Sequence, residues 1–432
     1  MPMDFLKELK WRGLIQDVTN GFDEEVKKNS VTAYIGFDPT SDSLHIGSLV
    51  QLIILKHFQL CGHKPIVLVG GATGMIGDPS GKSKERNLLN AGIIDKNISS
   101  IKNQLSKFLD FDKNKSNAAI ILNNYDWNSE LNIIDFFRDY GKLLTVNYMM
   151  SKDSVKKRLS TSDVSEGMSF TEFTYQLFQA YDFHYLIENY NCTIQMGGSD
   201  QWGNITSGVE LIRKKSGKKA HALTCPLITK ADGSKFGKTE EGNVWLDKEK
   251  TSPYKFYQYW LNSSDEDSIK YVKIFTFATK EFIDNLISEH SEVPHERKLQ
   301  KFISEEITKM VHSEEDLIKV KNASSILFGK NTSENLSNID EGTFLDVFSG
   351  VPNIELNKSY FNESETIEDL LDKTNFFSSK SEIRRLISQN SISINKTKID
   401  STFKISDIEL INNKYVLVQK GKKNYYLISV SS

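Results

Sequence analysis

The chain has few cysteines and no long apolar run. Its 432 residues include only three cysteines, Cys61, Cys192 and Cys225, and they lie far apart. This usage excludes a disulfide framework and a Cys-x-x-Cys metal site, and it favours a reducing compartment. No segment approaches the ~20 consecutive apolar residues of a membrane-spanning helix. The first eight residues carry acids and lack a cationic flank, so they predict no secretory or transit leader, and we expect a cytoplasmic protein without a membrane partner.

The chain also lacks a large net charge, although its charge is unevenly distributed. The total is −3, whereas the segment from Lys380 onward holds ten lysines and arginines against four acids, which makes that tail about +6 and the remainder about −9. Such an excess indicates either a polyanionic partner for one module or an ordinary solvated surface, and the counts leave both open. The length predicts two to four modules at ~150 residues each.

The first half of the chain alternates strand-like and helix-like segments. Residues 31–37 are β-branched and aromatic and stop at a proline, residues 48–60 form an apolar helix that ends before Gly62, and residues 65–69 form a buried strand. Strand, crossover helix and strand make the βαβ unit of a parallel sheet. Further strands are predicted at residues 118–122 and 192–196. We therefore predict an α/β fold with a Rossmann-like, doubly wound parallel sheet over residues 1–230.

Changes in composition divide the rest of the chain. Residues 231–330 contain a lysine-rich loop and then an aromatic, charged and helical pattern. Residues 331–364 are rich in serine, asparagine and acids, which is typical of a linker with some local structure. Residues 365–432 predict a short helix followed by short strands, with an excess of basic residues. We expect this last segment to be a small α+β binding module.

Two segments that follow predicted strands could hold phosphate. His45 and Gly47 precede a helix, whose first amides favour anions, although a His-x-Gly pair is as readily structural. Residues 69–83 are glycine-rich and end like a P-loop, but Ile76 stands where that motif requires glycine, which excludes it. Lys82 and Arg86 could still reach a phosphate, or they could be solvated bases of a turn.

A polar face on the predicted helix of residues 170–183 could hold a small ligand. At ~100° per residue, Tyr175, Gln179 and Asp182 fall within about 60° of one another. Buried polar groups need partners, and a ligand with an ammonium and a hydroxyl would supply them. A polar cluster that satisfies itself is the alternative.

Two later segments complete the candidate site. Asp200 and Gln201 directly follow a predicted strand, where acids and amides often hold ribose hydroxyls. Lys235 and Lys238 lie three residues apart in a glycine-containing loop that could close over a phosphate. A lysine-rich loop that is merely solvated is the alternative.

Taken in order, these segments resemble the motifs of class I aminoacyl-tRNA synthetases, and specifically of the bacterial-type tyrosyl-tRNA synthetases. Residues 45–48 resemble the HIGH element, and residues 235–239 resemble the tyrosyl form of the KMSKS element. Residues 34–40, 70–80, 175–183 and 197–204 also match, and the resemblance runs from about residue 3 to the C-terminus. Ser48 stands where the family usually has histidine or another polar residue; serine can still donate a hydrogen bond, so we expect a weaker or water-mediated contact with the ATP ribose and not a loss of activity.

The resemblance implies a two-step reaction in which L-tyrosine attacks ATP to form tyrosyl-adenylate and the terminal ribose of tRNA(Tyr) then takes the tyrosine. ATP is a substrate accompanied by Mg²⁺, with no permanently bound cofactor and no protein metal site. Stabilisation of the reacting phosphate falls to Thr40, His45, Lys82, Arg86, Lys235, Lys238 and Thr239. Tyrosine would contact Tyr34, Asp78, Tyr175, Gln179 and Asp182. ATP would contact Gly36, Asp38, His45, Gly47, Ser48, Gly198, Asp200, Gln201 and Lys238.

The resemblance also implies a homodimer, with an interface insertion in the first domain, and an S4-like RNA-binding domain at residues 365–432. There, tRNA phosphates would meet Arg384, Arg385, Lys422 and Lys423. The family rejects phenylalanine by hydrogen-bond mismatch, because that substrate would leave Tyr34 and Asp182 without partners. A small-molecule nucleotidyltransferase of the same superfamily and a non-catalytic RNA-binding protein on the same scaffold are the alternatives.

Overall fold

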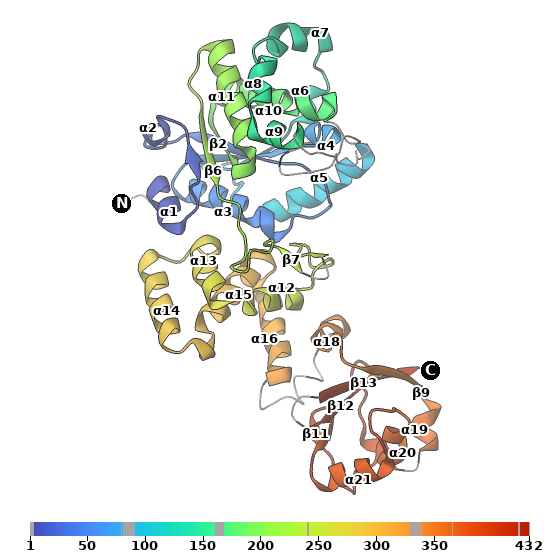
Figure 1. Cartoon of the computed structure of the whole chain (residues 1–432). Coiled ribbons are helices and arrows are strands. Elements are labelled where there is room, and N and C mark those ends of the chain that lie inside the picture. Colours follow the sequence, from blue (N-terminus) through green and yellow to red (C-terminus); the bar gives the residue numbers. More distant parts are fainter. Residues whose placement is uncertain are drawn as a thin grey trace. The chain divides into compact units, whose positions relative to one another are not determined.

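The computed structural model divides the chain into two compact units (Figure 1). Unit 1 comprises residues 1–251 and 260–311, and unit 2 comprises residues 252–259 and 312–432. The residues that the structure describes are 4–78, 80, 91–159, 168–239, 242–328, 336, 339–364, 366–421 and 424–431. No helix among them is long and apolar enough to cross a membrane.

A six-stranded sheet forms the centre of unit 1, in the order β1-β6-β5-β2-β3-β4. Its strands are β1 (Asp17–Val18), β2 (Thr32–Phe37), β3 (Lys64–Val69), β4 (Ile120–Asn123), β5 (Cys192–Gly198) and β6 (His221–Cys225). All neighbours are parallel except β1, which runs antiparallel to β6. The apolar run of β3 is buried on both faces, as parallel sheets require, and the five residues of β6 are buried as well, although His221 and Thr224 are polar. The predicted doubly wound α/β fold is confirmed.

The strand order reverses between β2 and β5. From β2 the chain proceeds outward to β3 and β4, and it then returns to form β5 and β6 on the other side of β2. Ligands of such sheets bind beside the carboxyl ends of the strands at this reversal. Phe37, Val69 and Gly198 end the three strands that meet there.

Helices cover both faces of the sheet. Helix α3 (Ile46–Leu60) packs on β2 and β3, while α10 (Phe170–Tyr190) and α11 (Trp202–Ser216) pack together over β5 on the opposite face (Figure 1). A capping box between Ser169 and Glu172 starts α10, and Asn191 ends it in the left-handed region at φ 51°. The other helices here are α1 (Phe5–Arg12), α2 (Phe22–Val26), α4 (Thr73–Ile76), α5 (Ala91–Leu105), α6 (Tyr125–Asn128), α7 (Ile133–Phe136), α8 (Val146–Met150) and α9 (Asp153–Leu159).

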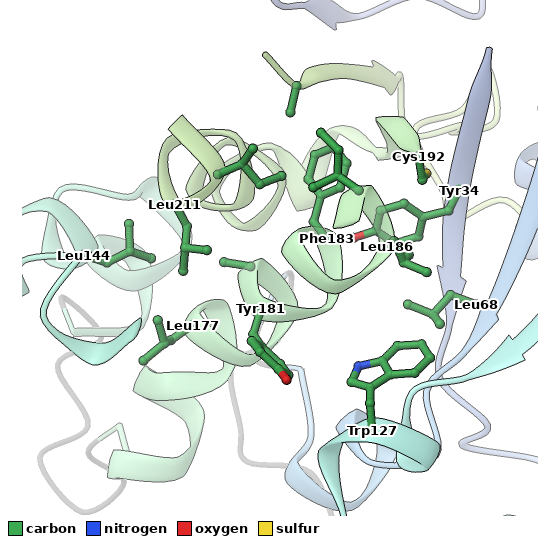
Figure 2. Close-up of a cluster of buried hydrophobic side chains, with 14 of the residues drawn as sticks. Tyr34, Leu68, Trp127, Leu144, Leu177, Tyr181, Phe183, Leu186, Cys192 and Leu211 are labelled. Atoms are coloured by element: carbon green, nitrogen blue, oxygen red, sulfur yellow. The ribbon is translucent and has the colours of Figure 1, made fainter. Parts of the chain in front are cut away.

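An aromatic and aliphatic core fixes α10 against the sheet (Figure 2). Tyr34 and Leu68 project from β2 and β3 toward Phe183 and Leu186 of α10, and the rings of Tyr34 and Phe183 lie 5.4 Å apart. Trp127 of α6 closes the same cluster. Burial of such side chains contributes roughly 1.5–3 kcal/mol each, so the polar face of α10 is held in a fixed position over the strand ends.

A helical segment completes unit 1. It contains the two short strands β7 (Lys238–Thr239) and β8 (Gly242–Asn243), and the helices α13 (Asp265–Phe275), α14 (Lys280–Glu292) and α15 (Lys298–Val311). Arg12 of α1 ties this segment to the rest of the unit. Its guanidinium donates to the carbonyls of Lys273 at 2.6 Å, Thr276 at 2.7 Å and Ala278 at 2.9 Å, which satisfies carbonyls at and just beyond the C-terminal end of α13.

Unit 2 contains a second, mostly antiparallel sheet, in the order β11-β10-β12-β13-β9. The strands are β9 (Asn353–Asn357), β10 (Ile392–Ile394), β11 (Thr397–Lys398), β12 (Tyr415–Lys420) and β13 (Asn424–Ser431). The helices are most of α12 (Pro253–Leu261), then α16 (Glu314–Phe328), α18 (Glu341–Val347), α19 (Ser359–Glu363), α20 (Ile367–Asp372) and α21 (Lys380–Ser388). Strand β9 pairs in parallel with β13, so this sheet extends back into the segment predicted as a linker.

Candidate active site

A cleft of about 620 Å³ opens at the carboxyl ends of β2, β3 and β5, where the strand order reverses. It brings together fifteen of the residues that the sequence predicted for the site. They are Tyr34, Gly36, Asp38, Thr40, His45, Gly47, Ser48, Asp78, Tyr175, Gln179, Asp182, Gly198, Asp200, Gln201 and Lys235. These residues come from segments up to 200 positions apart, and the sheet topology alone makes them neighbours.

Asp182 lies at the buried end of the cleft, with three hydrogen-bond donors on its carboxylate. Trp127 Nε1 donates to Oδ1 at 2.8 Å, Asn128 Nδ2 donates to Oδ1 at 2.9 Å, and Asn124 Nδ2 donates to Oδ2 at 2.9 Å. Asp182 is 1% exposed. A carboxylate offers about four acceptor sites, so one site on Oδ2 is left for a ligand that carries a hydroxyl or another donor.

Burial raises the pKa of Asp182 to about 7, although the hydrogen bonds from Asn124, Asn128 and Trp127 act in the opposite direction. The negative charge of Asp38 adds to the increase. The group therefore titrates near neutral pH, and a bound donor would favour its ionised form.

The hydroxyl of Tyr34 is the second polar group at this end. Tyr34 is 1% exposed, and among the described residues its hydroxyl has no hydrogen-bond partner. Oε1 of Gln195 likewise has no hydrogen-bond partner among the described residues. Gln195 lies beside Tyr34 in the sheet, at the matching register position of β5. Burial raises the pKa of Tyr34 well above its usual value, so the hydroxyl stays protonated and can donate. A buried hydroxyl without a partner costs free energy, which a ligand in the cleft would recover.

A chain of hydrogen bonds links Asp182 to Asp38. The amide of Asn124 donates to Thr73 Oγ1 at 3.0 Å, and that hydroxyl donates to Asp38 Oδ1 at 2.7 Å. Tyr175 donates to the other oxygen of Asp38 at 2.9 Å. The structure thus joins Tyr175 to a residue that the sequence had assigned to the nucleotide, and it fixes both carboxylates in place before any ligand binds.

Asp78 forms a second acidic position in the cleft. Its carboxylate accepts from the Ser80 amide at 2.9 Å and from Gln201 Nε2 at 2.7 Å. Gln201 follows β5 in a 3-10 turn, so the ends of β3 and β5 meet at this carboxylate. The amide of Asn204 also approaches this carboxylate, with Nδ2 at 3.5 Å from Oδ1.

The opposite end of the cleft is built around the start of α3. The Gly47 amide donates to Nδ1 of His45 at 3.0 Å, so the proton of the neutral imidazole resides on Nε2, where it can be donated to a ligand. A Cβ on Gly47 would lie 2.7 Å from the His45 ring, which explains why glycine follows the histidine by two positions. The positive end of the dipole of α3 attracts anions, so this end of the cleft suits a phosphate.

The loop with the two lysines lies beside this helix start. Lys235 and Lys238 are exposed, and Phe236 between them packs against Tyr271 and Phe275 with ring centroids 5.3 Å apart in both cases. A Cβ on Gly237 would lie 3.1 Å from Ile46 Cγ1, so the loop passes directly over the first turn of α3.

Val244 joins the loop to that turn. Its amide donates to the Gly237 carbonyl at 3.0 Å, and its carbonyl accepts from the Ile46 amide at 3.0 Å. His45 also forms a β-bridge with Trp245. The histidine segment and the lysine loop are therefore connected through one short stretch of backbone.

Several predicted residues are not placed in the cleft. Lys238 is exposed in β7 and does not line it, and Arg384 and Arg385 are exposed on α21 in unit 2. The side chain of Thr239 is not described, and Lys82, Arg86, Lys422 and Lys423 lie outside the described residues. These assignments stay predictions.

Sequence reasoning missed Thr73, Asn124, Trp127, Asn128 and Gln195, all of which contact or flank the predicted residues. Two signals were present. Asn124 follows a predicted strand, and Gln195 interrupts an otherwise apolar strand that is buried on both sides. A polar residue in such a strand requires a partner, which points to a site.

Comparison with known proteins places the whole chain. Residues 26–329 match the family described as tRNA synthetases class I (W and Y), and residues 343–428 match the C-terminal domain of tyrosine–tRNA ligases. The chain is 58% identical to a tyrosine–tRNA ligase of Flavobacterium psychrophilum and 56% identical to one of Bacteroides fragilis, over 99% of each chain in both cases. A C-terminally truncated mitochondrial tyrosyl-tRNA synthetase of Aspergillus nidulans is similar in structure, with a TM-score of 0.67 and 29% identity over 75% of this chain and 94% of that one.

Proposed function

The chain belongs to the tyrosine–tRNA ligase family of the class I tRNA synthetases, and we propose that its cleft activates L-tyrosine with ATP and passes it to tRNA(Tyr). The observation that carries this proposal is the buried end of the cleft. Asp182 keeps one acceptor site open there, and the Tyr34 hydroxyl has no partner among the described residues. A para-hydroxyl group both donates and accepts, so it would satisfy both residues at once.

The ammonium end of the amino acid is held by a second set of residues in the cleft. Asp78 attracts the substrate ammonium, and Tyr175 and Gln179 line the same wall. Tyr175 is oriented by its bond to Asp38, which keeps its ring against the substrate. Tyrosine then lies with its carboxylate directed toward the start of α3.

Activation is a displacement at the α-phosphorus of ATP. A carboxylate oxygen of tyrosine bonds to that phosphorus while the bond to the bridging oxygen of pyrophosphate breaks. Positioning and charge stabilisation supply the catalysis, since no protein nucleophile is required. His45 donates from Nε2 to a phosphate oxygen beside Thr40. Lys235 and Lys238 of the loop, together with Lys82 and Arg86, neutralise the charge of the departing pyrophosphate, and Thr239 donates a hydrogen bond to it.

The nucleotide is held by the strand ends. Gly36, Asp38, Gly47, Ser48 and Gly198 lie along the adenosine, and Asp200 and Gln201 lie beside its ribose. Mg²⁺ enters with ATP as part of the substrate. In the second step, a hydroxyl of the terminal tRNA ribose attacks the carbonyl carbon of the adenylate, and AMP leaves.

Unit 2 supplies the tRNA contacts. Arg384 and Arg385 are exposed on α21, within the part of the chain that carries the excess of basic residues. Contacts of this kind bind phosphates and position the tRNA without reading its bases. Lys422 and Lys423 extend the same basic segment, and the cytoplasm is the compartment in which the enzyme would meet its tRNA.

The active protein is a homodimer, formed through apolar side chains of α7, α8 and the π-helical segment Phe137–Gly141 that follows α7. Ile133 is 67% exposed and Ile134 is 71% exposed, and Phe137, Val146 and Met150 are exposed nearby. Several large exposed apolar side chains on neighbouring segments of the chain favour a protein interface. Sedimentation should give the mass of two chains, and Ile134→Glu should give one. A wild-type monomer at micromolar concentration would refute the dimer.

The test of the activity is ATP–pyrophosphate exchange with each of the twenty amino acids. We expect exchange with L-tyrosine and background with L-phenylalanine, because phenylalanine leaves Asp182 and Tyr34 unpaired. Equal exchange with both amino acids would overturn the assignment of the buried end. Exchange with tyrosine but no charging of tRNA(Tyr) would overturn the second step alone.

A further inference from the structure

Asn128 donates a hydrogen bond to Asp182 from the end of a short helix. It ends the four-residue helix α6, and its side chain reaches inward to a residue on α10 that lies 54 positions away in the sequence. Its Nδ2 donates to Asp182 Oδ1 at 2.9 Å and also to the Asn124 carbonyl at 2.8 Å. Both amide hydrogens are thus used, one for the helix end and one for the carboxylate.

The orientation of this amide is determined by its neighbours. Both groups that it meets, the carboxylate of Asp182 and the carbonyl of Asn124, can only accept hydrogen bonds. Reversing the amide would place Oδ1 against two acceptors. With Nδ2 facing them, Oδ1 is buried and has no partner among the described residues.

This arrangement is poor for stability, because an unpaired buried acceptor is costly and a leucine of similar volume would avoid it. Local rules of this kind are broken mainly at functional sites. The feature that Asn128 serves is the carboxylate of Asp182, because its bond completes the pair of donors on Oδ1 and leaves the open acceptor site on Oδ2.

We propose that Asn128 is a positioning residue for substrate specificity, which holds the Asp182 carboxylate ionised and turned so that its free site on Oδ2 faces the hydroxyl of tyrosine. The proposal rests on the proposed function. Without Asn128, Oδ1 would lose a donor that stabilises the ionised carboxylate, so the protonated form would be favoured. The consequences are weaker tyrosine binding and weaker discrimination against phenylalanine.

The surroundings of Asp182 define the pH range of the test. Tyr34 faces it from β2, and Tyr175 and Tyr181 face it from α10; burial raises the pKa of each of these tyrosines, so they stay neutral. Asp38, after β2, is the charged group that acts on it. Between pH 6 and 8.5, Asp182 is therefore the group of this set that we expect to titrate, since burial raises its pKa to about 7.

The experiment measures KM for tyrosine in ATP–pyrophosphate exchange at pH 6.5 and 8.5 for the full-length wild type, Asn128→Leu and the control Ser129→Leu. Ser129 is exposed at the same helix end. For Asn128→Leu we expect KM for tyrosine to rise about tenfold at pH 6.5 and to return to within about twofold of wild type at pH 8.5. We expect KM for ATP to be unchanged and the preference for tyrosine over phenylalanine to fall. The control should match wild type.

A merely structural asparagine gives a different result. An equal loss at both pH values, or a KM for tyrosine unchanged at both, would overturn the role of Asn128. If Asn128→Leu does not fold by circular dichroism, Asn128→Ala is judged by the same criteria with tyrosine affinity measured by calorimetry. Failure of the proposed function is distinguishable, because wild-type exchange would then not depend on tyrosine.

Discussion

The two ends of the cleft are built in opposite ways. At the buried end, Asp182 is fully enclosed and already holds three hydrogen bonds. At the other end, Lys235 and Lys238 project from a loop, and both are exposed. The carboxylate at the first end is held by side chains of the protein itself, whereas the two lysines at the second end are directed to solvent.

The difference separates recognition from catalysis. A preformed hydrogen-bonding site discriminates strongly, because a substrate that lacks the matching group leaves buried partners unpaired. Exposed cations of a loop can stabilise charge that appears only in the transition state, which raises the rate without tightening ground-state binding. Variants at the two ends should therefore change different kinetic constants.

The largest effect is expected at the buried end. Asp182→Ala removes the acceptor for the tyrosine hydroxyl, which should lower kcat/KM for tyrosine about a thousandfold, equivalent to about 4 kcal/mol. Pyrophosphate exchange measures this loss, and circular dichroism should show a folded protein. The surface variant Asp126→Ala on α6 is the control. Intact exchange in Asp182→Ala would mean that the polar face of α10 is only structural.

A smaller loss of a different kind is expected at the open end. Lys235→Ala should lower kcat for adenylate formation about a hundredfold, as removal of one transition-state donor does elsewhere, and should leave the affinity for tyrosine within about twofold. Single-turnover kinetics with tyrosine titration separates the two constants. A large rise in the dissociation constant of tyrosine would break the contrast between the two ends.

A third variant lies outside the cleft and should alter neither end. Arg384→Ala combined with Arg385→Ala removes two predicted phosphate contacts, which should raise KM for tRNA about tenfold and reduce its salt dependence. Exchange without tRNA should be unchanged. The assay is aminoacylation of tRNA(Tyr) at several salt concentrations, and charging equal to wild type would remove the RNA role of α21.

The smallest effect concerns the pH response of the fold, which must be separated from that of the site. His57 in α3 is buried, and burial with the nearby Arg12 lowers its pKa to about 3. The unfolded chain takes up this proton below pH ~6.5 and the native state does not, so this contribution to stability is present above that pH and is lost as the pH falls. When the pH is lowered from 8 to 6, the free energy of unfolding of wild type should fall by about 0.8 kcal/mol more than that of His57→Leu. Urea denaturation at the two pH values measures it, and identical pH dependence would exclude this role.

The sequence predicted the frame of the molecule better than its details. Buried aliphatic runs such as residues 65–69 identify central strands because few other structures bury both faces. Strand β6 was missed because five residues containing histidine, threonine and cysteine give no clear pattern. Strand β9 was missed because its short alternation of polar and apolar residues lies within a segment rich in serine, asparagine and acids.

The functional site, too, was predicted in its framework but not in its details. Residues at strand ends, such as Asp38 and Asp200, could be placed from topology alone. The donors to Asp182 could not, because Asn124 and Asn128 reach it from more than fifty residues away. Local patterns carry no information on such long-range pairs. Tyr175 was placed correctly on its helix, but its partner Asp38 was not foreseen.

The backbone of Val244 connects the two segments from which the family is recognised. Its amide donates a hydrogen bond to Gly237 and its carbonyl accepts one from Ile46, so the identity of its side chain is irrelevant to the connection. Almost any amino acid at this position would preserve the link, and only proline, which has no amide hydrogen, would cut it. Two motifs that a sequence search treats as independent are thus joined by backbone hydrogen bonds. This connection does not depend on side-chain identity, so the sequence does not reveal it.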